Sequence, residues 1–208
     1  MSSTEIAYEK KEHIMDIAEK LFAEYGYEAV STRKLAADAQ VNIAMISYYF
    51  GSKEDLYLAV IERRILSLRT ATHIIDDKHM THLDKLLHLV DMIIDRFFEN
   101  RLFHQIMYRE MGMSNRSKIF NFMMDKWLHN FNILKHIIED GIQKKVFKKV
   151  DAGFTILTII GTPRMYVQSD HMAQKIMNLK SLDEVYMLEM KNRLKNHLKD
   201  LITNHLSK

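Results

Sequence analysis

The chain has no cysteine, one proline and only six glycines among its 208 residues. The lack of cysteine excludes disulfides and thiol catalysis, and it agrees with a reducing compartment. Because proline and glycine are the main helix breakers and turn formers, their scarcity disfavours a turn-rich sheet protein. With 47% hydrophobic residues, the composition predicts an all-α chain built from long helices.

Membrane and export signals are also missing from the sequence. The N-terminus is polar, without the apolar core of a signal peptide, and no run of 18 apolar residues occurs anywhere. We therefore expect a soluble, cytoplasmic protein with no membrane partner.

Signatures of catalysis and of metal binding are absent as well. There is no G-x-S-x-G motif, no glycine-rich phosphate loop and no pair of carboxylates in a catalytic context, so no enzyme and no cofactor is expected. His79 and His82 form the only close histidine pair, and nothing near them completes a four-ligand zinc pattern. We expect no catalytic residue and no metal site.

Residues 31–57 carry the clearest pattern in the chain. A short helix over residues 32–39 has an apolar face of Leu35, Ala36 and Ala39. Gln40 and Val41 interrupt it. Asn42 is a good N-cap for a second helix over residues 43–49.

The second of these helices has two faces. Ile43, Ile46 and Phe50 have the spacing of an inward face that packs on the first helix. The side chains left to point outward or along the flanks are Ala44, Met45, Ser47, Tyr48 and Tyr49. The alternative is that Tyr48 and Tyr49 are ordinary core aromatics.

A third helix follows at once. Ser52 and Asp55 form a capping box, and Leu56, Tyr57 and Val60 would point inward. We expect this helix to continue to about residue 76. Two short helices joined by a tight turn are typical of a helix-turn-helix that reads DNA.

Residues 8–63 resemble the N-terminal domain of TetR-type bacterial transcriptional regulators. The resemblance rests on Ile14-x-x-x-Ala18-x-x-Leu21-Phe22-x-x-x-Gly26, on Thr32-x-x-x-Leu35-Ala36 with Val41, and on Tyr48-Tyr49-Phe50-x-Ser52-Lys53-x-x-Leu56. It implies a three-helix DNA-binding domain, residues 1–52 with the helix-turn-helix at about 31–50. A larger helical ligand-binding and dimerisation domain, residues 53–208, would follow.

The resemblance also implies which residues touch DNA. Thr32, Tyr49 and Lys53 would contact phosphates, and Arg33 would reach a base edge. The whole expected set is Thr32, Arg33, Lys34, Asn42, Ala44, Met45, Ser47, Tyr48, Tyr49 and Lys53. Ser47 departs from the family, which commonly has an aromatic there. For Lys53 the alternative is a solvated lysine at a helix start.

The charge balance of the N-terminal segment argues against DNA binding there. Residues 1–55 contain ten acidic residues against six Lys or Arg, although the whole chain has a net charge of +3. Phosphate contact depends on where the cations lie, and Arg33, Lys34 and Lys53 lie at helix starts, which favour anions. We expect the acids Glu12, Asp16, Glu19 and Glu24 to occupy the face away from DNA.

Outside the helix-turn-helix, hydrophobic periodicity predicts further helices. Residues 1–7 are expected to be a frayed tail before a helix over residues 8–25. The later helices are expected over residues 81–99, 103–112, 115–145 and 154–167, with a last one capped by Ser181. The segment 154–167 is apolar on most sides and is expected to be buried all round.

The C-terminal helices are rich in methionine and aromatic residues. An apolar ligand pocket would draw on Phe97, His104, Met107, Tyr108, Met123, Trp127, Phe131, Met165 and Tyr166, with Arg164 as a further polar contact. The alternative is ordinary core packing of a helical protein.

The last two helices have wide apolar faces at the end of the chain. By the resemblance they form a homodimer interface; the alternative is burial within one chain. The function expected is that of a dimeric repressor on a palindromic double-stranded DNA operator, released by a small apolar or amphipathic ligand. Two alternatives stay open: a regulator controlled by a protein partner, and a helical metal-binding or enzymatic protein that kept the fold.

Overall fold

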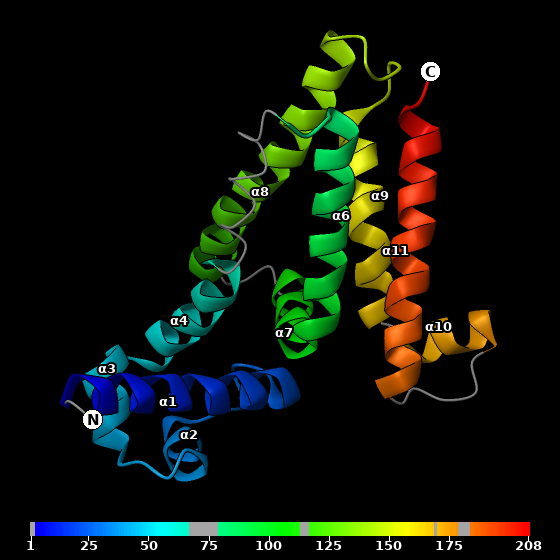
Figure 1. The fold of residues 1–208 in the computed structure, drawn as a ribbon. Helices are drawn as coiled ribbons and strands as arrows, with labels where there is room; N and C mark the ends of the chain where they lie inside the picture. The colour runs from blue at the N-terminus through cyan, green and yellow to red at the C-terminus, as the bar shows by residue number, and fades with distance from the viewer. Residues whose placement is uncertain (1–2, 67–78, 113–116, 169, 179–183) are drawn as a thin grey trace. The chain divides into compact units, whose positions relative to one another are not determined.

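The computed structural model describes residues 3–66, 79–112, 117–168, 170–178 and 184–208, and within these ranges the ordered elements are all helices (Figure 1). The chain divides into two compact units. The first contains residues 1–68 and 105–124, and the second residues 69–104 and 125–208. The all-α fold expected from the composition is confirmed.

The described ranges contain the following helices, in chain order. They are α1 (Ser3–Tyr25), α2 (Thr32–Asp38), α3 (Ile43–Phe50), α4 (Lys53–Leu66), α6 (His82–Glu99), α7 (Arg101–Gly112), α8 (Ser117–Gln143), α9 (Ala152–Gln168), α10 (Asp170–Met177) and α11 (Glu184–Leu206). The tail expected over residues 1–7 is wrong for residues 3–7, because α1 begins at Ser3 with Glu5 in its first turn, where an acid favours the helix dipole.

Three sequence expectations fall on residues outside the described ranges. They are the continuation of α4 to residue 76, the helix start at residue 115 and the N-cap at Ser181. The expected break after residue 99 is confirmed, since Asn100 caps the C-terminus of α6.

In the first unit, α1 packs against α2 and α4, and α3 packs against α2 and α4. The centre is aromatic: Phe22 and Tyr57 meet edge to face with centroids 4.8 Å apart, and Tyr27 lies 4.8 Å from Tyr57. Gly26 ends α1 with a φ of 83°, a value that glycine adopts without strain. The predicted inward residues of α4 (Leu56, Tyr57 and Val60) are all buried.

In the second unit, α6, α9 and α11 lie side by side, and α8 contributes its C-terminal half to the same core (Figure 1). Thr81 caps α6 and forms a capping box with Asp84. The buried core contains Leu86, Leu89, Val90, Ile94, Ile133, Leu134, Ile137, Ile138, Phe147, Ala152, Ile156, Ile159, Leu198, Ile202 and Leu206. This cluster is the main apolar core of the unit.

Charged side chains tie α11 to α6 along one side of this core. Lys191 and Lys195 lie 3.0 and 2.7 Å from the two carboxylate oxygens of Asp95. Burial raises the pKa of Asp95, but the two lysines outweigh it and hold that pKa below its usual value. The pairs fix the register of the two helices.

The link from α8 to α9 depends on one glycine. The ring of Phe147 folds back over Gly141 so closely that a Cβ there would lie 2.3 Å from the ring. The amides of Val146 and Phe147 both donate to the Gly141 carbonyl. Asp151 then caps α9 by accepting from the Phe154 amide at 3.0 Å.

The expectation that residues 154–167 are buried all round is wrong. Phe154 is 73% exposed and Leu157 is 64% exposed, and Met165 is exposed as well. With Gly161, whose Cα has open space around it, they form one stripe at helical spacing along α9. The helix is buried on its other side only. The short helix α10 was not predicted.

Candidate DNA-binding site

The turn between α2 and α3 closes through backbone hydrogen bonds. Ser31 caps α2 by accepting from the Lys34 amide at 3.1 Å. At the other end the Val41 amide donates to the Ala36 carbonyl at 2.9 Å. Between them Gln40 has a φ of 54°, a left-handed conformation that costs a non-glycine residue roughly 1–2 kcal/mol. The tight turn is therefore built with some strain.

Asn42 starts α3 as predicted. Its side-chain oxygen accepts from the Ala44 amide at 3.0 Å, which satisfies one of the free amides of the helix start. Ile46 is fully buried and anchors α3 to the core, and Phe50 is half-buried. Ile43 was predicted to face inward, and this is wrong: it is exposed, because the turn places the first residue of α3 at the edge of the packed face.

The opposite side of α3 is open to solvent. Tyr48 is 83% exposed, which rules out a core role for this aromatic. Ala44 and Ser47 are exposed, and Met45 and Tyr49 are half-buried along the flanks. Tyr48 and Tyr49 meet edge to face with centroids 5.1 Å apart. The helix thus presents a surface of small and aromatic side chains.

The two cations at the start of α2, Arg33 and Lys34, differ from each other in exposure. Arg33 is exposed, whereas Thr32 and Lys34 are half-buried. Lys34 Nζ lies 3.3 Å from Asp38 Oδ2 and 5.0 Å from the centroid of the Tyr25 ring. A surface pair of this kind is worth ~0–1 kcal/mol, so Lys34 can exchange Asp38 for another anion at small cost.

Lys53 is held inside the unit. Its Nζ donates to the carbonyl oxygens of Tyr27 at 3.0 Å and Val30 at 2.9 Å, and it lies 4.1 Å from the centroid of the Tyr27 ring. The predicted capping box also forms, since the Asp55 amide donates to Ser52 Oγ at 3.0 Å. Whether Lys53 touches a phosphate stays a prediction, but it is not a simply solvated lysine.

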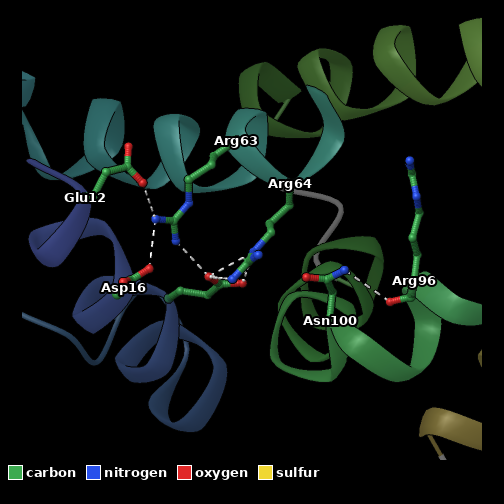
Figure 2. A network of polar contacts seen from close by, with 7 residues as sticks. Glu12, Asp16, Arg63, Arg64, Arg96 and Asn100 are labelled. Carbon is green, nitrogen blue, oxygen red and sulfur yellow. Dashed lines mark hydrogen bonds and ion pairs between the residues drawn. The ribbon is translucent and has the colours of Figure 1, made fainter. Parts of the chain in front are cut away.

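A charged network joins α4 to α1 (Figure 2). Arg63 Nη1 lies 2.9 Å from both Glu12 and Asp16, and its Nη2 lies 3.0 Å from Glu19. Arg64 donates to Glu19 through Nε at 2.9 Å and Nη2 at 2.8 Å. Glu19 is only 3% exposed, so its carboxylate depends on these two guanidinium groups. The network fixes α4 against α1.

The same network accounts for much of the acidity of the N-terminal segment. Glu12, Asp16 and Glu19 lie on one face of α1 at spacings of four and three, and they face α4. The arginines that pair with them, at 63 and 64, were not counted in the charge balance of residues 1–55. The clue available in the sequence was a run of like charges on one helix face, which needs a cationic partner, and the adjacent arginines at 63 and 64.

The candidate effector residues do not fall in one place. In the second unit Phe97 and Tyr166 belong to one buried cluster with Val167 and Met190. His104 stacks on Phe97 with ring centroids 3.9 Å apart. Phe131 packs instead on the main core, and Met165 is exposed.

The remaining candidates lie in the first unit or outside the described side chains. Met107 is buried and Tyr108 is exposed, and both belong to the first unit. The side chains of Met123 and Trp127 lie outside the described part of the chain. The predicted set is therefore reduced, within the second unit, to the group around Phe97, His104 and Tyr166.

The stacked histidine gives a test of this group. Burial lowers the pKa of His104 to about 4; a hydrogen bond to the Arg96 backbone opposes this, and the positive charge of Arg164 adds to it. The folded pKa is below the unfolded one, so the unfolded chain takes up the proton first as the pH falls. The free energy of unfolding should drop by about 3 kcal/mol between pH 6.5 and 4.

Chemical denaturation at a series of pH values, compared with His104→Gln, measures this contribution. The variant should lose less stability over that range than the wild-type protein. His136→Gln, at an exposed position on α8, is the matched control and should follow the wild type. Parallel pH profiles for all three proteins would show that His104 is not responsible.

One histidine of the pair considered for metal binding, His82, has a carboxylate partner in the structure. His82 Nε2 lies 2.6 Å from Asp140 Oδ2, and Lys144 Nζ lies 2.8 Å from the same oxygen. Lys144 and His82 together lower the pKa of Asp140 to about 2. Among the described residues no three His, Asp or Glu side chains gather as a metal would require.

A capped recognition helix on a buried anchor, after a strained tight turn, defines a helix-turn-helix DNA-binding protein. Residues 14–60 match the family described as "Bacterial regulatory proteins, tetR family". The N-terminal segment of the chain is therefore a DNA-binding domain of the tetR family type, and the comparisons support a TetR-type transcriptional regulator.

Individual relatives agree with this assignment. The chain is 57% identical over 49 residues to the HTH-type transcriptional dual regulator CecR of Shigella flexneri, which is 24% of this chain and 22% of that protein. It is 28% identical over 169 residues to the "Probable HTH-type transcriptional regulator YttP" of Bacillus subtilis, covering 79% and 80% of the two chains. The match to CecR thus spans about a fifth of that relative's length.

The fold has solved counterparts. The structure of the transcriptional regulator FadR from Bacillus subtilis, in complex with stearoyl-CoA, superposes with a TM-score of 0.67 at 23% identity, over 90% of this chain and 96% of that one. At this identity the likeness shows the fold alone. In the described parts of the chain, none of the helices has the length and apolar character needed to cross a membrane.

Proposed function

We propose that the chain acts as a dimeric repressor that binds a palindromic operator and is released by a small apolar or amphipathic ligand. The observation that carries the DNA-binding part is the exposed face of α3, held in place by the buried Ile46 and the Asn42 cap. A surface with Tyr48 83% exposed serves no packing purpose within the unit. Base edges in a major groove are surfaces that such a helix fits.

The contacts divide by chemistry. Ala44, Met45, Ser47 and Tyr48 would face bases, because small and apolar groups suit thymine methyls and hydroxyls suit either acceptors or donors. Arg33, exposed at the start of α2, would reach a guanine edge. Thr32, Lys34, Asn42 and Tyr49 would contact phosphates from the flanks.

Dimerisation is supported by the stripe on α9. Phe154, Leu157 and Met165 are exposed large apolar side chains on one side of this helix, and Leu188 is exposed on α11. Contiguous exposed apolar residues of this kind mark interaction surfaces. A second copy would cover them and would place two recognition helices about 34 Å apart, one turn of DNA.

The effector would bind near the aromatic group in the second unit. Phe97, Tyr166 and the stacked His104 supply an apolar surface with one polar ring, and the charge of Arg164 acts on that ring. An amphipathic ligand with an anionic or polar end matches this chemistry. The FadR structure of Bacillus subtilis, which contains stearoyl-CoA, is a solved example of this fold with such a ligand.

Release follows if the effector prefers the conformation that does not fit the operator. The network of Arg63 and Arg64 with Glu19 makes α1 and α4 one rigid part. Any reorientation of α4 is then carried by the whole DNA-binding unit rather than lost in bending. The distance between the two recognition helices of the dimer changes, and the fit to successive grooves is lost.

Selection from random duplex DNA, followed by anisotropy titration of the selected site, tests the function. The wild-type protein should return a palindromic consensus, with two chains bound per site. Arg33→Ala or Tyr48→Ala should weaken the selected site by about 1–3 kcal/mol and relax the consensus at one symmetric pair of positions.

Lys149→Ala, at an exposed cation of the second unit, is the matched control and should leave the consensus unchanged. If neither Arg33→Ala nor Tyr48→Ala alters the selected sequence, the assignment of these residues to base contacts is wrong. If the wild-type protein selects nothing in the absence of added ligand, the repressor proposal fails.

A further inference from the structure

Lys53 differs from the other cations near the DNA-binding surface in the partners that its ammonium group contacts. Its Nζ donates to two backbone carbonyls, those of Tyr27 and Val30, at 3.0 and 2.9 Å. The same ammonium lies 4.1 Å from the centroid of the Tyr27 ring, within range of a cation–π contact. Arg33, by contrast, is exposed at the start of α2.

The two carbonyls belong to the link between α1 and α2. That link leaves α1 at Gly26, with a φ of 83°, and enters α2 at the Ser31 cap. Val30 is fully buried at its end. The link lies between two helices, and an ammonium group from another element that donates to its carbonyl oxygens can fix its path.

Lys53 is the first residue of α4, so its contacts join the start of α4 to the link that precedes α2. An ammonium group has three N–H donors, and two of them are directed at these carbonyls. A phosphate would have to compete with two charge-assisted hydrogen bonds and an aromatic face. The charge is directed into the protein.

We propose that Lys53 is a positioning residue for DNA recognition: it fixes the residue 27–30 link, and thereby the placement of Arg33 and Thr32 relative to α3. This assignment rests on the DNA-binding function proposed above, and it replaces the phosphate contact that the family resemblance implies for Lys53. A positioning residue and a phosphate contact differ in salt dependence, since only a phosphate contact releases counterions.

The test compares Lys53→Met with Lys34→Met on the selected operator and on a random duplex, over a range of salt concentrations. Lys53→Met should weaken operator binding about tenfold or more while leaving binding to the random duplex and both salt slopes unchanged. Lys34→Met, at a proposed phosphate contact, should weaken both DNAs and reduce the slope by about 0.9 for each chain. A slope reduced in this way by Lys53→Met would overturn the proposal.

A second variant separates charge from geometry. Lys53→Arg keeps the positive charge, and a phosphate contact would survive the change, but a planar guanidinium does not place one nitrogen on both carbonyls. The variant should therefore still lose discrimination between operator and random duplex. Wild-type discrimination in Lys53→Arg would count against the positioning role.

A third measurement needs no DNA. Amide hydrogen exchange of residues 28–34 should be faster in Lys53→Met than in the wild type, with α1 unchanged. The same exchange in both proteins would overturn the assignment even if the variant binds DNA poorly. Because this readout is independent of any operator, failure of the proposed function and failure of the positioning role are distinguishable.

Discussion

Replacing Glu19 with glutamine should destabilise the first unit by about 3–5 kcal/mol, the cost of breaking a buried ion pair from one side. Glu19 is 3% exposed, and its carboxylate accepts from Arg63 at 3.0 Å and from Arg64 at 2.8 and 2.9 Å. A neutral amide cannot match two guanidinium groups: Arg64 would lose the buried carboxylate that it pairs with, and Arg63 would lose one of its three carboxylate partners. Urea denaturation, with amide exchange along α1 and α4, measures the loss.

Asp16→Asn is the graded control for this experiment. The Asp16 side chain is 57% exposed and makes one contact to Arg63 at 2.9 Å, so its loss should cost no more than about 1 kcal/mol. Equal small losses for Glu19→Gln and Asp16→Asn would mean that the network contributes little and that α4 is held to α1 by apolar packing alone.

Replacing Phe154 with arginine should convert the proposed dimer into a monomer at concentrations where the wild-type protein associates. Phe154 is 73% exposed in the single chain and lies at the N-terminal end of the apolar stripe, with Leu157 one turn away. A charge placed there would be desolvated by the second copy without a partner. A loss of about 2.7 kcal/mol or more, or at least a hundredfold in dimer affinity, is expected.

Sedimentation equilibrium measures the dimer, and operator titration measures its consequence. Val146→Arg is the matched control, because Val146 is also exposed but lies in the link between α8 and α9 and away from the stripe. The control should stay dimeric and bind the operator normally. A Phe154→Arg protein that remains dimeric would show that the α9 stripe is not the interface.

The helix-turn-helix was predictable because its determinants are local. Asn42 caps α3 and Ser52 caps α4, and each side chain accepts a hydrogen bond from an amide only two or three residues further along the chain. The buried position of Ile46 follows from helical spacing. The same holds for the end of α1 at Gly26, where the left-handed backbone favours glycine.

The errors share a different cause. Ile43 and the apolar residues of α9 were assigned to the interior by hydrophobicity, but hydrophobicity does not say which surface covers a side chain. Phe154 and Leu157 are as apolar as the core residues Ile156 and Ile159 of the same helix, and only the packing of α6 and α11 on one side of α9 separates them. An apolar stripe that is exposed on the chain and one that is covered within the chain look alike in sequence.

The contacts that hold the DNA-binding unit together could not be predicted in detail either. Lys53 meets carbonyls 23 and 26 residues away, and Arg63 and Arg64 meet Glu19 from 44 and 45 residues away. A lysine at a helix start has the same local sequence whether it faces a phosphate or a carbonyl. The nearest backbone oxygen is a property of the fold.

The sequence by itself therefore determined most of the helices, the caps at Asn42 and Ser52 and the outward position of Tyr48, since periodicity and capping act within a few residues. The tertiary structure alone decided where the charges of Lys53, Arg63 and Arg64 are used, and which apolar face of α9 stays open. Those outcomes depend on partners brought close only by folding, because the energy of an ion pair or an apolar contact depends on distance in space and on exclusion of water.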